Sequence, residues 1–194
     1  MSEFQAFPKI TRFHREWIIT EKIDGTNAQV RFVELDGYQS ADPKCVAQSN
    51  GLAMFVGSRT RWITPQDDNA GFARWCLEHF EELSAMGPGS HFGEWYGCGI
   101  QRNYGLSEKR LALFNVARWS ESRPACCDVV PVIRVSDGEH LSDDIRNALN
   151  VLRATGSYMV QGFMRPEGVV IRHTPSGVLM KATLDGDGHK GANR

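Results

Sequence analysis

The sequence predicts an α+β fold in which antiparallel sheets carry flanking helices. Segments with strand character outnumber segments with helical character along the 194 residues. Neighbouring strand candidates are often joined by turn-sized gaps, such as the Thr-Pro-Ser-Gly segment at residues 174–177. Short gaps favour hairpins, because a parallel pair of strands needs a long crossover connection. Hairpins combined with few helices are typical of the α+β class.

Eight segments are predicted to form strands. Each is a short run rich in β-branched, aromatic or other apolar residues and bounded by glycine or other turn-forming residues. In chain order they are residues 17–20, 28–33, 52–56, 90–95, 111–117, 129–135, 168–173 and 178–183.

Two segments are predicted to form helices, because their apolar residues recur at intervals of three and four. The first covers residues 72–83 and is ended by the Gly-Pro pair at 87–88. In the second, the same spacing runs over residues 145–152, with Ser142 as the expected N-cap and Gly156 as the end. Each helix is expected to bury one face.

Length and composition favour a single domain over residues 1–194, with residues 185–194 as a mobile tail. The apolar share of 41% and the charged share of 23% exclude the disordered and membrane classes. The formal charge is 22 − 23 = −1, so the chain lacks the overall basic excess of many nucleic-acid binders. Any polynucleotide contact must come from a local patch. The candidates are Arg59, Arg61, Arg102, Lys109 and Arg110.

The sequence carries no evident targeting or metal-binding signal. No charged and then apolar leader begins the chain, and no run of about 18 apolar residues occurs, which predicts a cytoplasmic protein without membrane contact. The five cysteines form no Cys-x-x-Cys pair, and the six histidines form no His-x-x-x-His pair. We therefore expect reduced thiols, and neither a disulfide framework nor a zinc site.

One lysine stands at the end of a predicted strand. Lys22 follows the first strand and precedes Ile-Asp-Gly, a turn in which Gly25 allows close backbone approach and Asp24 could orient the amine or act with a metal ion. A free lysine is mostly protonated at neutral pH, so a nucleophilic lysine needs surroundings that favour the neutral amine. The segment alone leaves two readings open: a nucleophile, or a surface lysine in a hairpin.

The segment Glu-Lys-Ile-Asp-Gly-Thr-Asn at residues 21–27 resembles the nucleophile motif of the covalent nucleotidyltransferases, which include DNA ligases, RNA ligases and mRNA capping enzymes. The Glu before the lysine and the Thr-Asn after the glycine are similar to the RNA ligases that seal nicks in double-stranded RNA. Asp24 departs from that branch, in which many members have His, and is commoner in DNA ligases.

Three further segments match motifs of this superfamily in the expected order. Arg59, in Gly-Ser-Arg-Thr, resembles an arginine that contacts the nucleotide or the nucleic-acid end. Glu94, in Phe-Gly-Glu-Trp-Tyr-Gly, resembles a glutamate that binds the ribose hydroxyls, and Phe114 resembles an aromatic that stacks on the purine. Taken singly, they are equally a loop arginine, a solvated glutamate and a buried phenylalanine.

The last two motifs lie near the end of the chain. Glu167, in Glu-Gly-Val-Val-Ile-Arg, resembles a glutamate that helps to hold a divalent cation. Lys181 fills the first position of a Lys-x-Lys motif beside the α-phosphate, but Thr183 stands in the second. Any one short motif is weak, whereas several in order form a strong joint signal.

The resemblance implies a nucleotidyltransferase (adenylation) domain of the ligase/ATP-grasp-like type that uses ATP with Mg²⁺ or Mn²⁺. Lys22 would attack ATP and carry AMP, which passes to a polynucleotide 5′-phosphate before a 3′-hydroxyl attacks. Further roles follow from the same resemblance. Lys181 and Arg59 would bind phosphate, Glu167 the metal ion, Glu94 the ribose and Phe114 the purine. Glu21 would contact the adenine amino group, Asn27 a phosphate or nucleic-acid end, and Asp24 would lie near the nucleotide.

The expected substrate is RNA, as a nicked duplex or as ends. A DNA ligase, a GTP-using capping enzyme and a non-catalytic nucleotide- or RNA-binding module, with Thr183 as a sign of decay, are the alternatives. Relatives in this superfamily commonly append an OB-fold or helical module near where this sequence ends. We therefore expect a catalytic core that adenylylates itself but joins ends inefficiently by itself. A partner protein could replace the C-terminal domain.

Overall fold

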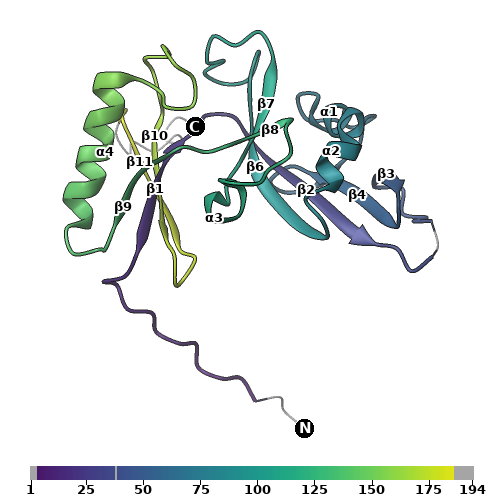
Figure 1. The fold of residues 1–194 in the computed structure, drawn as a ribbon, viewed down its shortest axis with the longest axis horizontal. Coiled ribbons are helices and arrows are strands. Elements are labelled where there is room, and N and C mark those ends of the chain that lie inside the picture. Colours follow the sequence, from purple (N-terminus) through teal and green to yellow (C-terminus); the bar gives the residue numbers. More distant parts are fainter. Residues whose placement is uncertain (1–3, 38, 186–194) are drawn as a thin grey trace, which may run out of the picture.

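The computed structural model describes residues 4–37 and 39–185 and contains two β-sheets (Figure 1). The first sheet has four strands in the order β11-β10-β1-β9. Its strands are β1 (Trp17–Lys22), β9 (Val132–Ser136), β10 (Gly168–His173) and β11 (Leu179–Thr183). All three of its pairings are antiparallel.

The second sheet has the strand order β3-β4-β2-β6-β7-β8, and β5 pairs with β4. Its strands are β2 (Thr26–Glu34), β3 (Cys45–Ser49), β4 (Leu52–Gly57), β5 (Trp62–Ile63), β6 (Gly89–Gly97), β7 (Lys109–Leu113) and β8 (Cys127–Val129). Only the pairing of β7 with β8 is parallel among the strands that the structure describes.

Helices cover one face of each sheet (Figure 1). The helix α4 (Leu141–Thr155) packs on the first sheet through Leu152 against Ile19 and Ile171 of a common core. The helices α1 (Phe72–Glu78) and α2 (Phe80–Ser84) pack on the second sheet, where they share a larger core with β2, β4 and β6. The short helix α3 (Val116–Trp119) follows β7.

The two sheets are joined where β1 runs directly into β2. Only residues 23–25 separate the two strands, which belong to different sheets. A third core of Ile23, Tyr96, Tyr104, Ala112, Val116 and Val130 fills this junction. A Cβ atom at Gly25 would overlap the carbonyl oxygen of Trp95, so the chain can pass this close to β6 only with glycine.

This architecture confirms the predicted α+β class with antiparallel sheets and flanking helices. The strand at residues 168–173 has the predicted bounds, and five other predicted strands differ by one to two residues at their ends. The strands β3 and β5 and the helix α3 were not predicted.

Several predicted bounds are wrong. The helix predicted at residues 72–83 breaks at His79, which has φ −106° and whose ring nitrogen lies 2.9 Å from the carbonyl oxygen of Trp75. Ser142 is not an N-cap, because α4 already begins at Leu141 and the carbonyl of His140 accepts the first amide hydrogen bonds.

Two other predicted strands are also wrong, because one ends early and the other is split. The strand predicted at residues 111–117 ends at Leu113, because the Asn115 side chain accepts a hydrogen bond from the backbone N–H of Arg118 and starts α3. The strand predicted at 129–135 is split around Pro131, which has no N–H to donate to a neighbouring strand.

Three further predictions concern less regular features. Residues 186–194 of the expected mobile tail lie outside the described residues, whereas Asp185 bonds to Arg102. The five cysteines are free thiols, two buried and three half-buried. Within residues 4–37 and 39–185, no helix is both long and apolar enough to span a membrane.

Candidate active site

The amine of Lys22 and the carboxylate of Glu167 meet where β1 ends and β10 begins. Lys22 is the last residue of β1, and Glu167 directly precedes β10, its antiparallel neighbour. The Nζ atom of Lys22 lies 2.6 Å from Oε2 of Glu167. The side chain of Lys22 is 22% exposed and that of Glu167 is 8% exposed. The pair is therefore largely desolvated but open on the side of the lysine.

Glu94 brings a second carboxylate to this place from the other sheet. It lies in β6 opposite Asn27 of β2. Its carboxylate accepts a hydrogen bond from the backbone N–H of Gly25 at 3.1 Å and one from the Asn27 amide at 3.5 Å. Burial raises the pKa of Glu94, and the positive charge of Lys22 opposes this rise. The junction thus combines one cation with two carboxylates, drawn from both sheets.

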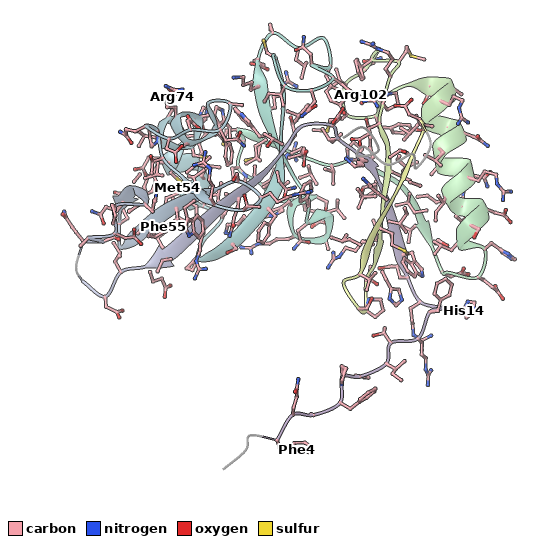
Figure 2. All side chains as sticks on the ribbon, turned by 180° about the vertical axis from the view of Figure 1, so that it is seen from behind. Phe4, His14, Met54, Phe55, Arg74 and Arg102 are labelled. Atoms are coloured by element: carbon pink, nitrogen blue, oxygen red, sulfur yellow. The ribbon has the colours of Figure 1, made fainter. Side chains whose placement is uncertain are left out.

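Asp24 is fixed by an arginine that is distant in sequence. Its carboxylate accepts a hydrogen bond from Arg102 Nε at 3.0 Å, and its backbone N–H donates to the Tyr104 hydroxyl at 2.8 Å. Arg102 also donates to the carbonyl of Arg165 at 3.0 Å and to Asp185 at 2.6 Å. Figure 2 places Arg102 near the junction of the sheets. This guanidinium ties the turn after Lys22 to the segment before Glu167 and to the end of β11.

Lys181 lies on the same face of the first sheet as Lys22. Directly opposed residues of antiparallel strands project from one face. The register pairs Lys22 with Gly168 and Gly168 with Thr183, and it pairs Val170 with Lys181. Thr183 therefore lies opposite Lys22 across β10. Lys181 lies two residues before Thr183 in β11 and so projects from the same face. Lys181 is exposed, so its amine is free to reach a ligand above this face.

Phe114 and Arg59 come to the second sheet from two different strand ends. Phe114 follows β7, its backbone N–H donates to the carbonyl of Phe92, and its side chain is 39% exposed. The pairing of Glu94 with Ala112 in β7 puts Phe114 on the face of Glu94. Arg59 is exposed in the turn after β4, and no hydrogen bond or ion pair joins it to another described residue.

Glu21 points away from Lys22, because successive residues of a strand project to opposite faces. Its carboxylate accepts hydrogen bonds from the Ser157 hydroxyl at 2.6 Å and from the backbone N–H groups of Tyr158 at 2.7 Å and Met159 at 2.9 Å. Burial raises the pKa of Glu21, and these three hydrogen bonds partly offset the rise. The structure thus separates Glu21 from Lys22, Glu94 and Glu167, and its adenine contact stays a prediction.

The structure therefore gathers Lys22, Asp24, Asn27, Glu94 and Glu167 at one junction. Sequence reasoning missed what holds them, namely the positioning of Asp24 by Arg102 and of Glu21 by the 157–159 turn. Neither arrangement has a local signal in the sequence, because each joins segments more than 70 residues apart.

Most of the cations proposed as a local patch bind other groups of the protein. Arg61 bonds to Asp67, Arg110 to Glu108, and Lys109 to the carbonyl of Ala70 at 2.8 Å. Arg102 is shared by Asp24 and Asp185. Of the five candidates, Arg59 and Lys109 form no ion pair with a described residue, and Arg59 forms no side-chain hydrogen bond to one either.

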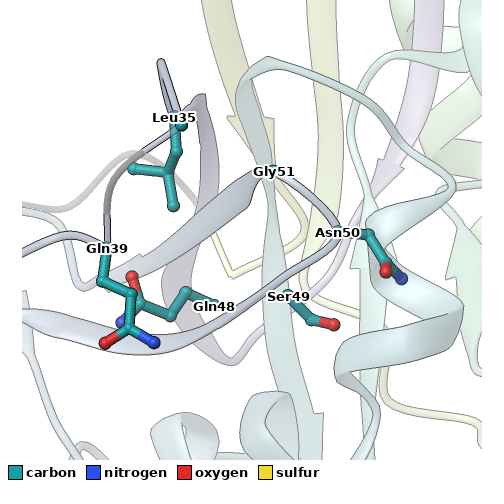
Figure 3. A pocket seen from close by; sticks show the side chains of 7 residues that line it. Leu35, Gln39, Gln48, Ser49, Asn50 and Gly51 are labelled. Carbon is teal, nitrogen blue, oxygen red and sulfur yellow. The ribbon is translucent and has the colours of Figure 1, made fainter.

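The described residues contain no cluster of three or more His, Cys, Asp or Glu that could hold a metal ion alone. A divalent cation would need ligand oxygens besides Glu167. A separate hollow of about 280 Å³ lies at the hairpin of β3 and β4 (Figure 3). It is lined by Leu35, Gly37, Gln39, Gln48, Ser49, Asn50 and Gly51, residues that suit neither proton transfer nor phosphate charge.

Solved structures with the same fold include several of an RNA ligase from Naegleria gruberi. One, a variant with ATP and Mn, is 19% identical with a TM-score of 0.61 and matches over 88% of this chain and 50% of that one. A second, with PPi, is 19% identical with a TM-score of 0.57 and the same coverage. A third, a variant with AMP and Mn, is 17% identical with a TM-score of 0.55. This chain therefore spans about half the length of these structures.

A family model described as RNA ligase matches residues 15–183. No curated protein sequence matches the chain. The matched range contains both sheets and every residue gathered at their junction, from Lys22 to Glu167. On this match, together with the shared fold, the chain belongs to the RNA ligase family.

Proposed function

We propose that this chain is the adenylyltransferase core of an ATP-dependent RNA ligase and that Lys22 carries the AMP. The observation that carries the proposal is the Lys22 amine at 2.6 Å from Glu167, at a junction where Glu94 supplies a second carboxylate. The RNA ligase family match supports RNA as the substrate class, and relatives of the same fold have been solved with ATP, AMP and Mn.

In the first step, the neutral amine of Lys22 attacks the α-phosphorus of ATP. A phosphorus–nitrogen bond forms, and the bond from the α-phosphorus to the bridging oxygen breaks with release of pyrophosphate. The amine must lose a proton to react, and the Glu167 carboxylate at hydrogen-bond distance is its nearest acceptor. The salt bridge thus holds the amine beside a carboxylate that can take its proton.

A divalent cation fits beside Glu167 when the nucleotide provides its other ligands. Mg²⁺ is usually bound by one or two carboxylates together with substrate phosphates, and Glu167 offers one largely desolvated carboxylate. A bound cation would be held by Glu167 and would supply neutralisation of phosphate charge.

The remaining groups bind and orient the nucleotide. Glu94 has the acceptor oxygens to take both ribose hydroxyls, and the exposed ring of Phe114 on the same face offers a surface for the purine. Lys181 and Arg59 are exposed cations that can approach the phosphates. Asn27 and Asp24 hold the turn that follows the nucleophile.

In the later steps, AMP passes from Lys22 to the 5′-phosphate of an RNA end. The phosphorus–nitrogen bond breaks and a pyrophosphate link forms between AMP and the end. A 3′-hydroxyl then attacks the 5′-phosphorus, loses its proton, and expels AMP. Both displacements depend on positioning and charge neutralisation more than on new protein chemistry.

The test is intact-mass analysis and α-labelled ATP with Mg²⁺ or Mn²⁺. We expect one added AMP, none on Lys22→Ala or Lys22→Arg, and an unchanged level on Lys44→Ala, which alters an exposed lysine. Labelling of the Lys22→Ala protein would overturn the nucleophile. Parallel assays with GTP, and with nicked RNA, hybrid and DNA duplexes, test the nucleotide and the polynucleotide, and sealing of DNA alone would overturn the RNA assignment.

A further inference from the structure

The N-terminal segment, residues 4–16, stands away from the rest of the protein. Residues 4–12 form neither helix nor strand, and Figure 1 shows them running outward from the start of β1. Figure 2 shows Phe4 near the outer end of this arm and His14 near its root. The residues Phe4, Phe7 and Ile10 are 90%, 83% and 82% exposed. The arm thus exposes three large apolar residues within one short segment, and exposed apolar groups that lie together mark interaction sites.

The root of the arm is firmly attached. The carbonyl of Phe13 accepts hydrogen bonds from the Trp17 indole N–H at 3.1 Å and from the Arg15 backbone N–H at 2.9 Å. The rings of Phe13 and Trp17 lie 5.4 Å apart between centroids. Trp17 is itself buried in the core under α4. The direction in which the arm leaves the body is therefore set by β1.

The arm repeats its residue types every three positions. Phe4, Phe7, Ile10 and Phe13 form one series. An extended polyproline-type backbone has three residues per turn, so it would place these side chains along one side, and Pro8 favours that backbone. The spacing matches neither the alternation of a strand nor the stripe of an α-helix.

A second series on the same period is cationic. Lys9, Arg12 and Arg15 are spaced by three, and residues 4–15 contain no Asp or Glu. All three are exposed, and none forms an ion pair with another described residue. Residues 4–15 thus carry a charge of +3, or +2 with the adjoining Glu16, which contrasts with the net charge of −1 for the chain and with the paired arginines of the body. The charge points to an anionic partner.

We propose that the arm, residues 4–15, is a binding site for single-stranded polynucleotide, with Lys9, Arg12 and Arg15 on phosphates and Phe4 and Phe7 stacked on bases. Alternating aromatic and basic side chains give sequence-tolerant binding of single strands. The apolar series alone would also suit another protein surface, but the interleaved cations favour a phosphate backbone. The proposal rests on the proposed function only for the identity of RNA as the natural strand.

The root of the arm lies one strand length from the candidate active site, because the arm joins β1 at Trp17 and Lys22 ends that strand. Five strand steps from Trp17 to Lys22 cover about 17 Å. Twelve extended residues cover about 40 Å. A polynucleotide bound along the arm would therefore need to extend only about 17 Å beyond the root of the arm to reach Lys22.

The experiment measures the anisotropy of a fluorescent 20-nucleotide RNA with a 5′-hydroxyl, without ATP, using the whole chain at several salt concentrations. The charge variant is Lys9→Gln with Arg12→Gln and Arg15→Gln. The matched control is Lys44→Gln with Arg146→Gln and Arg153→Gln, which removes three exposed cations elsewhere. We expect the arm variant alone to weaken binding at least about tenfold and to lower the salt slope by about 2.

Aromatic variants test stacking. Phe4→Ser with Phe7→Ser is expected to weaken binding about fivefold or more per ring, and Phe4→Tyr with Phe7→Tyr to restore it. Because neither contact uses the 2′-hydroxyl, the loss should be equal on single-stranded DNA, and it should vanish on blunt duplex RNA, whose bases are stacked. Both sets of variants keep wild-type AMP labelling of Lys22.

Several results would overturn the arm site. The first is unchanged RNA binding by the charge variant, and the second is an equal loss of RNA binding in the control variant. The third is a concentration-dependent dimer of the wild type that the Phe4→Ser, Phe7→Ser variant abolishes while it still binds RNA. Absence of AMP on wild-type Lys22 would instead count against the proposed function, and arm-dependent RNA binding would stand without it.

Discussion

The Nζ atom of Lys22 lies 2.6 Å from Oε2 of Glu167, although 145 positions separate the two residues in the chain. The contact follows from the register of β1 against β10, in which Lys22 opposes Gly168. Gly168 has a φ of +154°, and a Cβ atom there would overlap the carbonyl oxygen of Ala182 in β11. The glycine after Glu167 thus lets β11 pack close to β10, and the register of these strands puts Lys181 and Thr183 on the face of Lys22.

Replacing Glu167 with Gln should slow AMP transfer to Lys22 by about 100-fold or more, the usual size of a proton-transfer contribution. The amide preserves shape but neither accepts the lysine proton nor binds a divalent cation well. Single-turnover labelling measures the rate, and Glu108→Gln, an exposed glutamate paired with Arg110, is the control. A Glu167→Gln rate equal to that of the wild type would show that the ion pair has no role in the reaction.

Glu21 should make the protein less stable as pH rises. Burial raises its folded-state pKa above the ordinary value of 4.5, so the folded protein holds the proton more tightly than the unfolded chain. This contribution is fully present below about pH 4.5 and is lost as pH rises through the raised value. In the Glu21→Gln variant, the amide oxygen can still accept from the Tyr158 and Met159 N–H groups and the amide NH2 group can donate to the Ser157 oxygen, while the titration is removed.

Urea unfolding between pH 4 and pH 7 measures the effect, with Glu139→Gln as an exposed control. As pH rises from 4 to 7, the free energy of unfolding of the wild type should fall relative to that of the Glu21→Gln variant. Parallel pH curves for the two proteins would contradict the assignment. The KM for ATP gives a second readout, because a weaker affinity in Glu21→Gln would support the adenine contact that the family resemblance implies.

Removing the Arg102 side chain should destabilise the protein by about 2 kcal/mol, because Asp24 then keeps a largely buried charge without its cation. The turn after Lys22 would loosen from residues 165–166, so AMP transfer should slow as well. Arg146→Ala breaks an exposed pair with Asp143 and should cost under about 0.5 kcal/mol. Urea midpoints and labelling rates are measured together, and equal losses in the two variants would refute the bridging role of Arg102.

Phe114→Ala should raise the KM for ATP about tenfold, which is within the range for loss of one base-stacking contact. Phe114→Trp should restore most of the affinity, whereas Phe114→Leu should not, because a planar ring is required. Since the side chain is 39% exposed, the folded protein should lose little stability. A KM that is the same for Ala, Leu and Trp would exclude stacking on this ring.

The fold class and most strands were predictable from local pattern. Runs of β-branched residues, glycine and the turn at 174–177 act over a few positions, and β10 accordingly has the predicted bounds. The errors arise where tertiary contacts decide. The stacking of Trp75 on His79 accompanies a helix break, and Asn115 starts a helix within a run that reads as strand.

The sequence by itself determined the α+β class, the order of the motifs and the choice of Lys22 as the candidate nucleophile. The tertiary structure alone decided that Glu167 and Glu94 meet at Lys22, that Glu21 faces the other side of β1, and that Arg102 holds Asp24. The physical reason is the distance along the chain over which each kind of interaction acts. Turn and strand preferences act between neighbours, whereas these contacts depend on strand register and on the packing of two sheets, to which distant segments contribute together.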